Sequence, residues 1–349
     1  MENITVKEVN QLLASDGEAY NYFGASVAFS ADGLVAMVGA YTLNANETGK
    51  VYTYNRDNIN DDWKEVNIMT ASDDVEAVHF GSSVSLSSDG LVAIVGDCGD
   101  NDIANGAGKV YTYIRDSIKY KWVKINQLTA SDGGKCDYFG SSVSLSSDGL
   151  VAIVGATSDD DIDVNSGKVY TYIRATIYDR WNEVNKLSIN SKKRDNFGCS
   201  VSLSGDGLTT MIGSNITCKV YTYTRNSITD EWVEVNHLTD SNGYACDFFG
   251  TSVSLSSDGL VAIVGADSSN TEDFEGGKIV IYSRDNITDD WVEVDQLFAS
   301  DSKDFINFGS SVALSSDGLV VMVAAMGYST LDNKKVGKVY TYTINNNSE

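Results

Sequence analysis

Residues 139–156 read FGSSVSLSSDGLVAIVGA, and this stretch decides the fold because the chain repeats it six times. The FG dipeptide recurs at spacings of 57, 59, 58, 52 and 59 residues, beginning at Phe23, Phe80, Phe139, Phe197, Phe249 and Phe308. Such a period is typical of repeat architectures, in which each repeat forms one supersecondary unit. The chain of 349 residues therefore reads as one set of repeats rather than as two or three unrelated domains.

Each repeat predicts four short strands. In the third repeat these are SVSLS at 142–146, LVAIVG at 150–155, KVYTYIR at 168–174 and WNEVNKL at 181–187. The second is almost wholly apolar, which is typical of a strand covered on both faces. The third is rich in β-branched and aromatic residues. An SSDG segment joins the first two, and its Asp-Gly pair predicts a tight hairpin turn.

Four antiparallel strands in each repeat predict a propeller blade. We therefore expect an all-β, six-bladed β-propeller. The predicted blades span residues 20–73, 77–132, 137–190, 195–242 and 247–301, and finally 305–344 together with 6–16.

The two ends of the chain predict how the ring closes. The last repeat stops at GKVYTYTINNN and lacks the W-x-E-V-N-x-L strand. The segment VKEVNQLLASDG at 6–17 matches WVEVDQLFASD at 291–301, with Val6 in place of the tryptophan. The N-terminal segment is therefore expected to form the fourth strand of the last blade. The alternative, an open solenoid, would not need matching half-repeats.

These motifs resemble the FG-GAP repeat of integrin α-subunit propellers, in the bacterial and protist version with F-G-x-S-V-x-L-S-x-D-G and V-G-A. The resemblance covers nearly the whole chain and implies the propeller fold. It implies little about activity, because a propeller hosts many functions.

The chain departs from that family at its calcium loop. Where integrin-type repeats have D-x-D-x-D-G, this chain has S-S-D-G with one carboxylate, and calcium takes about six to eight oxygens. Turn residues, not metal ligands, are therefore expected at Asp32, Asp89, Asp148, Asp206, Asp258 and Asp317. No cofactor is predicted. Weak binding of a cation such as calcium is considered only for the acidic loop of blade 3, through Asp159, Asp161 and Asp163.

The charge of the chain restricts its partners. With 49 acidic and 25 basic residues, the net charge is −24, which repels nucleic acids and anionic membrane surfaces. Basic proteins, cations and neutral ligands such as sugars remain as candidate partners. No apolar stretch approaches the length of a membrane span, and MENITVKEVN has no signal-peptide core. We expect a soluble monomer; its five cysteines, without a CxxC pair, slightly favour an intracellular protein.

No catalytic motif stands out in the sequence. G-x-S-x-G, H-E-x-x-H and Walker-type loops are absent, and no nucleophile motif accompanies His79 or His237. The five tryptophans share one repeat position, which favours packing. The arginines that end the third strand are expected to form ion pairs within each repeat. We therefore predict a binding or scaffold protein and not an enzyme.

The variable loops are the predicted binding region. In a propeller, the segments entering the first strand and the connections between the second and third strands emerge on one face, and loops often provide function. Blade 4 differs most: its entry loop contains Lys192, Lys193 and Arg194, and its connection shrinks to 214–217. We expect a protein partner to bind there or at the adjacent channel mouth.

The alternative is a carbohydrate-binding lectin with sites between blades or on the loop face. Aromatic residues that precede the FG dipeptides, and so offer faces for a sugar ring, are Tyr20, Tyr22, Tyr138, Tyr244 and Phe248. They vary among the blades, which argues against six equivalent sugar sites.

Overall fold

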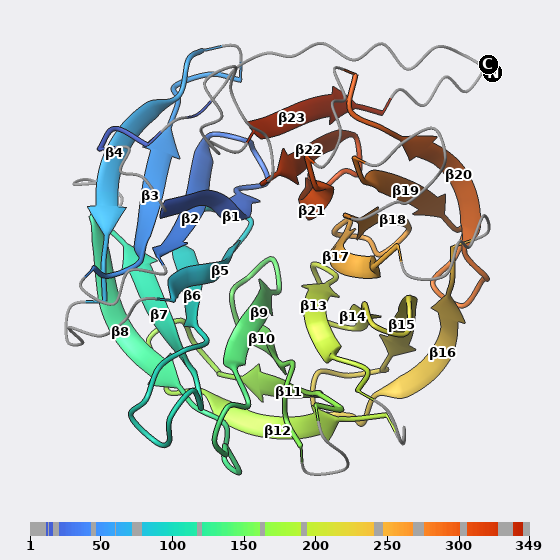
Figure 1. Cartoon of the computed structure of the whole chain (residues 1–349), viewed down its shortest axis with the longest axis horizontal. Coiled ribbons are helices and arrows are strands. Elements are labelled where there is room, and N and C mark those ends of the chain that lie inside the picture. Colours follow the sequence, from blue (N-terminus) through green and yellow to red (C-terminus); the bar gives the residue numbers. More distant parts are fainter. Residues whose placement is uncertain are drawn as a thin grey trace.

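Six antiparallel sheets stand around a central axis in the computed structural model, as the six repeats predict (Figure 1). The structure describes residues 12, 14–16, 21–42, 47–59, 61–71, 79–116, 121–160, 165–189, 194–240, 247–267, 276–300, 306–326 and 338–344. Within these ranges no helix could span a membrane.

The strands follow one another in the same order in every blade. Blade 1 contains β1 (Asn21–Phe29), β2 (Val35–Thr42), β3 (Lys50–Asn55) and β4 (Lys64–Met69). Blade 2 contains β5 (Phe80–Leu86), β6 (Val92–Asp97), β7 (Lys109–Arg115) and β8 (Trp122–Leu128). Blade 3 contains β9 (Phe139–Leu145), β10 (Val151–Ala156), β11 (Lys168–Ile173) and β12 (Asn182–Leu187).

The second half of the ring repeats this order. Blade 4 contains β13 (Phe197–Leu203), β14 (Thr209–Ser214), β15 (Lys219–Thr224) and β16 (Val233–Leu238). Blade 5 contains β17 (Phe249–Leu255), β18 (Val261–Ala266), β19 (Lys278–Ser283) and β20 (Val292–Leu297). Blade 6 contains β21 (Phe308–Leu314), β22 (Val320–Ala325) and β23 (Lys338–Thr343). The first strand of each blade lies nearest the axis, and β21 lies beside β1 (Figure 1).

The hydrophobic core lies between blades rather than within them. One cluster joins Val92 and Leu128 of blade 2 to Phe139 and Ala152 of blade 3. Phe139 is fully buried and meets the ring of Tyr170 edge-on, with centroids 5.4 Å apart. Because each blade buries its apolar face only against its neighbour, the ring supplies stability that a single blade lacks.

A glycine in each second strand allows the closest approach between blades. A Cβ on Gly155 would stand 2.1 Å from the carbonyl oxygen of Gly198, the FG glycine of the next blade. Four other junctions show the same approach, at 2.0 or 2.1 Å: Gly39 to Gly81, Gly96 to Gly140, Gly213 to Gly250 and Gly265 to Gly309. Any side chain at these positions would push the blades apart, which explains why VG and FG recur together.

A serine hydroxyl reinforces the same junction. Ser142 donates a hydrogen bond of 2.8 Å to the Gly198 carbonyl oxygen, and Ser26, Ser83, Ser200 and Ser252 do the same at their junctions. The second serine of F-G-S-S is therefore an inter-blade contact.

The junction between blades 6 and 1 is built differently. Ala324 occupies the position of the second-strand glycine, and it is buried. Gly24 is the FG glycine it would face, and a Cβ on Gly24 would meet nothing within 4 Å. The methyl group of Ala324 therefore keeps blade 1 from approaching as closely as the other blades approach one another.

The end of the N-terminal segment docks on blade 1. Leu12 and Ala14 pack against the cluster that contains Val38 and Tyr52, as Leu128 and Ala130 pack on blade 3. Residues 6–11 lie outside the described residues, so the fourth strand of blade 6 stays a prediction, which the position of Leu12 and Ala14 supports.

The SSDG segments form turns on the face opposite the variable loops. The Asp148 carboxylate accepts hydrogen bonds from the Ser146 hydroxyl (2.6 Å) and the Leu150 amide (2.9 Å). Gly149 has φ +67°, a conformation that glycine adopts at little cost. The expected turn role of these aspartates is confirmed.

The arginines that end the third strands have a different role from the expected ion pairs. Arg174 donates from Nε and Nη2 to the Gly149 carbonyl oxygen and from Nη1 to that of Ile177. Its guanidinium also lies 4.2 Å from the centre of the Trp181 ring. Arg56, Arg225 and Arg284 stack on their tryptophans in the same way, at 4.2–4.4 Å. The arginine thus holds the turn and the tryptophan together.

Replacing Gly155 with Ala should lower the free energy of unfolding by about 1–3 kcal/mol or more, because overpacking a tight contact forces the backbone to move. Thermal unfolding followed by circular dichroism measures the effect. The control is Ala324→Gly, at the same repeat position in blade 6, which introduces no clash. Equal unfolding midpoints for wild type and Gly155→Ala would contradict the packing argument.

Replacing Arg174 with Lys should destabilise the chain by about 1–3 kcal/mol, since an ammonium group can neither bridge the two carbonyl oxygens nor stack flat on Trp181. The exposed Arg180 is the control, and Arg180→Lys should leave the unfolding midpoint within error. Equal unfolding midpoints for Arg174→Lys and Arg180→Lys would show that the Arg174 guanidinium stabilises the chain no more than an exposed arginine does.

Candidate functional site

The variable loops of neighbouring blades meet on one face, which we call the loop face. It consists of the segments before each FG and the connections between second and third strands. The Tyr138 amide donates to the Gly106 carbonyl oxygen in blade 2, at 3.0 Å, and the Asn196 amide donates to Asn165 in blade 3, at 3.3 Å. In these two blades the connection therefore contacts the entry segment of the following blade, as the propeller prediction requires.

One residue of each blade, directly before the FG phenylalanine, stands at the mouth of the central channel. These mouth positions are Tyr22, His79, Tyr138, Asn196, Phe248 and Asn307. The carbonyl oxygen of Tyr138 accepts a 3.0 Å hydrogen bond from the amide of Ser141, which lines the channel. Phe248 and Thr251 make the same contact in blade 5. The channel therefore begins just below the mouth positions.

The channel itself is lined by small, uncharged side chains. It has a volume of about 270 Å³, and serine is the commonest residue in its lining, followed by valine, leucine and alanine. Some of these hydroxyls are engaged between blades: the Ser144 oxygen accepts a hydrogen bond from the Leu203 amide at 3.0 Å. Such a channel offers hydroxyl groups but no charge to a ligand at its mouth.

Three rings stack on the loop face where blades 1 and 2 meet. Tyr22 and Tyr41 lie parallel within 12°, with centroids 4.9 Å apart, and His79 follows Tyr41 at 5.9 Å. Burial lowers the pKa of His79. Burial also raises the pKa of Tyr41, so its phenol stays neutral at physiological pH.

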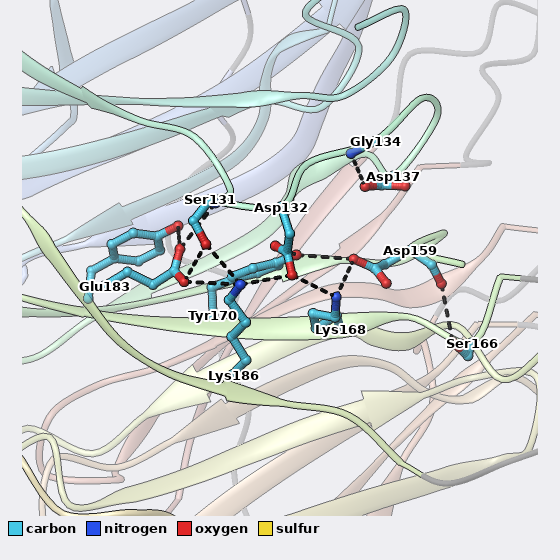
Figure 2. A network of polar contacts seen from close by, with 11 residues as sticks. Ser131, Asp132, Gly134, Asp137, Asp159, Ser166, Lys168, Tyr170, Glu183 and Lys186 are labelled. Atoms are coloured by element: carbon cyan, nitrogen blue, oxygen red, sulfur yellow. Dashed lines mark hydrogen bonds and ion pairs between the residues drawn. The ribbon is translucent and has the colours of Figure 1, made fainter. Parts of the chain in front are cut away.

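A network of charged groups ties blade 2 to blade 3 beside the loop face (Figure 2). Asp132 follows β8, and its carboxylate lies 3.2 Å from Lys168 Nζ and 2.8 Å from Lys186 Nζ. The Tyr170 hydroxyl lies 2.8 Å from Asp132 and 3.0 Å from Asp159. Burial would raise the pKa of Asp132, but hydrogen bonds from Lys186, Tyr170 and Lys168 outweigh it and lower the pKa to about 2.

Other blades have a related pair built on the lysine that starts the third strand. Lys50 pairs with Asp16 at 2.6 Å, Lys109 with Asp100 at 3.0 Å and Lys278 with Asp240 at 2.6 Å. The Lys278 and Asp240 side chains are 3% and 5% exposed. A buried ion pair costs desolvation energy, so its main effect is to fix how the segment from one blade sits on the next.

Three of the aromatic residues that the sequence proposes for sugar stacking or partner contact lie in the described structure. Tyr22, Tyr138 and Phe248 all occupy mouth positions and are 37%, 37% and 36% exposed. Tyr20 and Tyr244 lie outside the described residues.

Of the charged residues that the sequence proposes for binding, only Arg194 and Asp159 lie in the described structure. Arg194 is exposed beside the mouth position Asn196, while Lys192 and Lys193 lie outside the described residues. Asp159 is 2% exposed and lies 3.1 Å from Lys168 Nζ, so a positive charge already faces it. Asp161 and Asp163 lie outside the described residues, and the weak cation site stays a prediction. In the described ranges no three His, Cys, Asp or Glu side chains surround a common point as a metal would require.

The geometry adds residues that sequence reasoning missed. Tyr41 lies near the end of β2, where it stacks on Tyr22 of its own blade and on His79 of the next blade. The lysines of the ion pairs were also missed, although Lys begins the third strand in all six repeats. That repetition was the signal available in the sequence.

Comparison with known proteins agrees with the repeats. The FG-GAP repeat family matches residues 6–54, 63–113, 122–172, 232–282 and 291–342. The chain belongs to the FG-GAP repeat family. Each match begins at the fourth-strand position and the first begins at residue 6, which agrees with the predicted closing strand. The matches leave out 173–231, which contains β12 of blade 3 and the first three strands of blade 4 of this FG-GAP propeller.

Solved structures share the fold of this FG-GAP propeller at low sequence identity. The periplasmic gluconolactonase PpgL of Pseudomonas aeruginosa is 15% identical, with a TM-score of 0.56 over 93% of this chain and 87% of that one. A functionally unknown protein of Desulfotomaculum acetoxidans is 12% identical, with a TM-score of 0.58 over 93% and 90%. Saccharomyces cerevisiae Sqt1 is 10% identical, with a TM-score of 0.53 over 99% and 87%. No curated protein sequence matches the chain. Likeness at this level establishes the fold and not the activity.

The Asp132 network predicts a pH-dependent contribution to stability. Because the pKa of Asp132 is about 2 in the folded chain against an ordinary 3.8, its contribution is present above pH 4 and is lost as the pH falls toward 2. Asp132→Asn should therefore unfold at a lower temperature than wild type at pH 7, and the difference should shrink between pH 4 and pH 2. The control is Asp57→Asn, in an exposed pair with Lys64. A difference that is constant with pH would contradict the assignment.

Proposed function

We propose that this FG-GAP propeller is a non-catalytic binding module that engages a protein partner through its loop face. The observation that supports this most is the contrast between the two faces. The six turns read SSDG in four blades, SADG in blade 1 and SGDG in blade 4. All six make the same serine-to-aspartate hydrogen bond of 2.5 or 2.6 Å, whereas the mouth positions and their loops differ from blade to blade. A scaffold with one uniform and one varied face is typical of a protein that binds through the varied one.

Blade 4 is the proposed docking sector. Its connection between Ser214 and Lys219 is the shortest between a second and a third strand, so the loop face is lowest there. Arg194 is exposed beside it, in a chain of net charge −24. A local positive charge on this acidic protein favours a partner that presents an acidic group at blade 4 on a surface that is otherwise neutral or basic.

A catalytic role is not part of the proposal, although the solved structures that share this fold include a gluconolactonase. Of the two histidines, His79 is packed in the aromatic stack and His237 lies on the outer strand β16 against Tyr221. The chain has no other histidine to act as a general base.

Charge reversal tests the protein-binding proposal. The variant K192E/K193E/R194E should capture less of a protein partner than wild type in a pull-down from cells that express the chain. The control K64E/K121E/R180E makes the same change in charge near the opposite face and should capture as much as wild type. Equal capture by wild type and the blade 4 variant would remove blade 4 as the docking sector.

Carbohydrate binding is the second candidate function, and one observation favours it. Tyr22, Tyr138 and Phe248 leave more than a third of their surface exposed around a channel lined with hydroxyl groups. Exposed aromatic faces beside hydrogen-bonding groups suit a sugar, whose ring has both apolar faces and hydroxyls.

A further inference from the structure

Two exposed aromatic residues at the channel mouth are held in a costly backbone conformation. Tyr138 has φ +56° and Phe248 has φ +53°, in the left-handed region that bulky residues rarely adopt. Such a conformation costs about 1–2 kcal/mol for a residue with a Cβ. Asn196 and Asn307 occupy the same position in blades 4 and 6 with φ +52° and +54°, and asparagine tolerates this region far better.

Packing explains only part of why Tyr138 and Phe248 are aromatic. The two residues are 37% and 36% exposed, so each leaves more than a third of its surface in solvent. Exposed aromatic residues in a strained conformation, where asparagine would fit, point to a ligand that uses their rings.

The two rings and an amide occupy three successive mouth positions. Tyr138 belongs to blade 3, Asn196 to blade 4 and Phe248 to blade 5, so the three follow one another around the ring. Asn196 Nδ2 lies 3.5 Å from Asn215 Oδ1, in the short connection of blade 4. This connection is the shortest between a second and a third strand in the chain.

The mouth positions themselves are uncharged, whereas Arg194 is exposed two residues before Asn196. The aspartates that precede Tyr138, Asn196 and Phe248 are buried. The six mouth positions include no lysine, arginine or carboxylate. Below them, Ser141, Cys199 and Thr251 line the channel. Asparagine amides and hydroxyls pair with the hydroxyls of a neutral sugar, whereas an anionic ligand would meet the field of a chain with net charge −24.

We propose that the channel mouth between blades 3 and 5 binds a neutral carbohydrate. The Tyr138 and Phe248 rings offer apolar faces to sugar rings of the carbohydrate, and the Asn196 amide hydrogen-bonds its hydroxyl groups. This inference rests on the second candidate function above and does not require a protein partner. It assigns one site at the channel mouth rather than a site at every blade junction.

The test uses the full chain on an array of neutral and acidic oligosaccharides, followed by calorimetric titration with the best-bound sugar. Y138N/F248N removes both rings but inserts the residue that blades 4 and 6 use at this position. We expect wild type to bind neutral sugars and the variant to bind them at least about tenfold more weakly, an effect of about 1.4 kcal/mol. The unfolding midpoint of the variant should equal or exceed that of wild type, because the strain is relieved.

Tyr178→Asn is the matched control. Tyr178 is 76% exposed and lies in the β11–β12 connection, which Arg174 ties to the SSDG turn on the opposite face. This variant should bind sugars as wild type does.

Three results would overturn the inference: no binding to any neutral sugar, equal binding by wild type and Y138N/F248N, or binding of acidic sugars alone that depends on Arg194. Protein capture that K192E/K193E/R194E abolishes, with no sugar bound, would reject the carbohydrate site and leave the protein-binding proposal standing.

Discussion

The contact between a second-strand glycine and the FG carbonyl oxygen of the next blade sets the geometry of the whole ring. At five junctions the space for a Cβ is already occupied by that oxygen, at 2.0 or 2.1 Å. The approach brings the serine hydroxyl of F-G-x-S within hydrogen-bonding distance of the same carbonyl oxygen. It also fixes the first strands around a narrow channel and places the six mouth positions around its opening. The second-strand glycine of one blade and the FG glycine of the next blade therefore form the two sides of a single contact.

The sixth junction shows what happens without that contact. Ala324 stands in place of the second-strand glycine, and blades 6 and 1 lack the close approach. Ala313 occupies the repeat position that Ser144 has in blade 3. A belt of backbone hydrogen bonds around the channel also stops here. It runs from Ala31 through Ser88, Ser147, Gly205 and Ser257 to Ser316, while no bond from Ser316 to Ala31 closes it in the described residues.

The repeats predicted the fold because each strand and turn has a local signature that recurs six times. The predicted binding region also followed from topology, and the exposure of Tyr22, Tyr138 and Phe248 agrees with their position before FG. Other features could not be predicted, because they arise between blades. The stack of Tyr41 on His79 joins two repeats, and Lys168 reaches Asp132, which lies 36 residues earlier. The left-handed conformation of Tyr138 had one sequence signal, the asparagines at 196 and 307, but nothing in a single repeat shows that this position has positive φ.

Amide hydrogen exchange of the native chain tests most directly whether the glycine contact holds the ring. The amides of Ala31, Ser88, Ser147, Gly205 and Ser257 each donate across a blade junction, at 2.8–3.0 Å. If close approach of the blades protects them, they should exchange slowly, and the Ser316 amide at the junction with Ala324 should exchange much faster. Protection of Ser316 equal to that of the other five would show that the ring is held equally at all six junctions, without regard to the glycine.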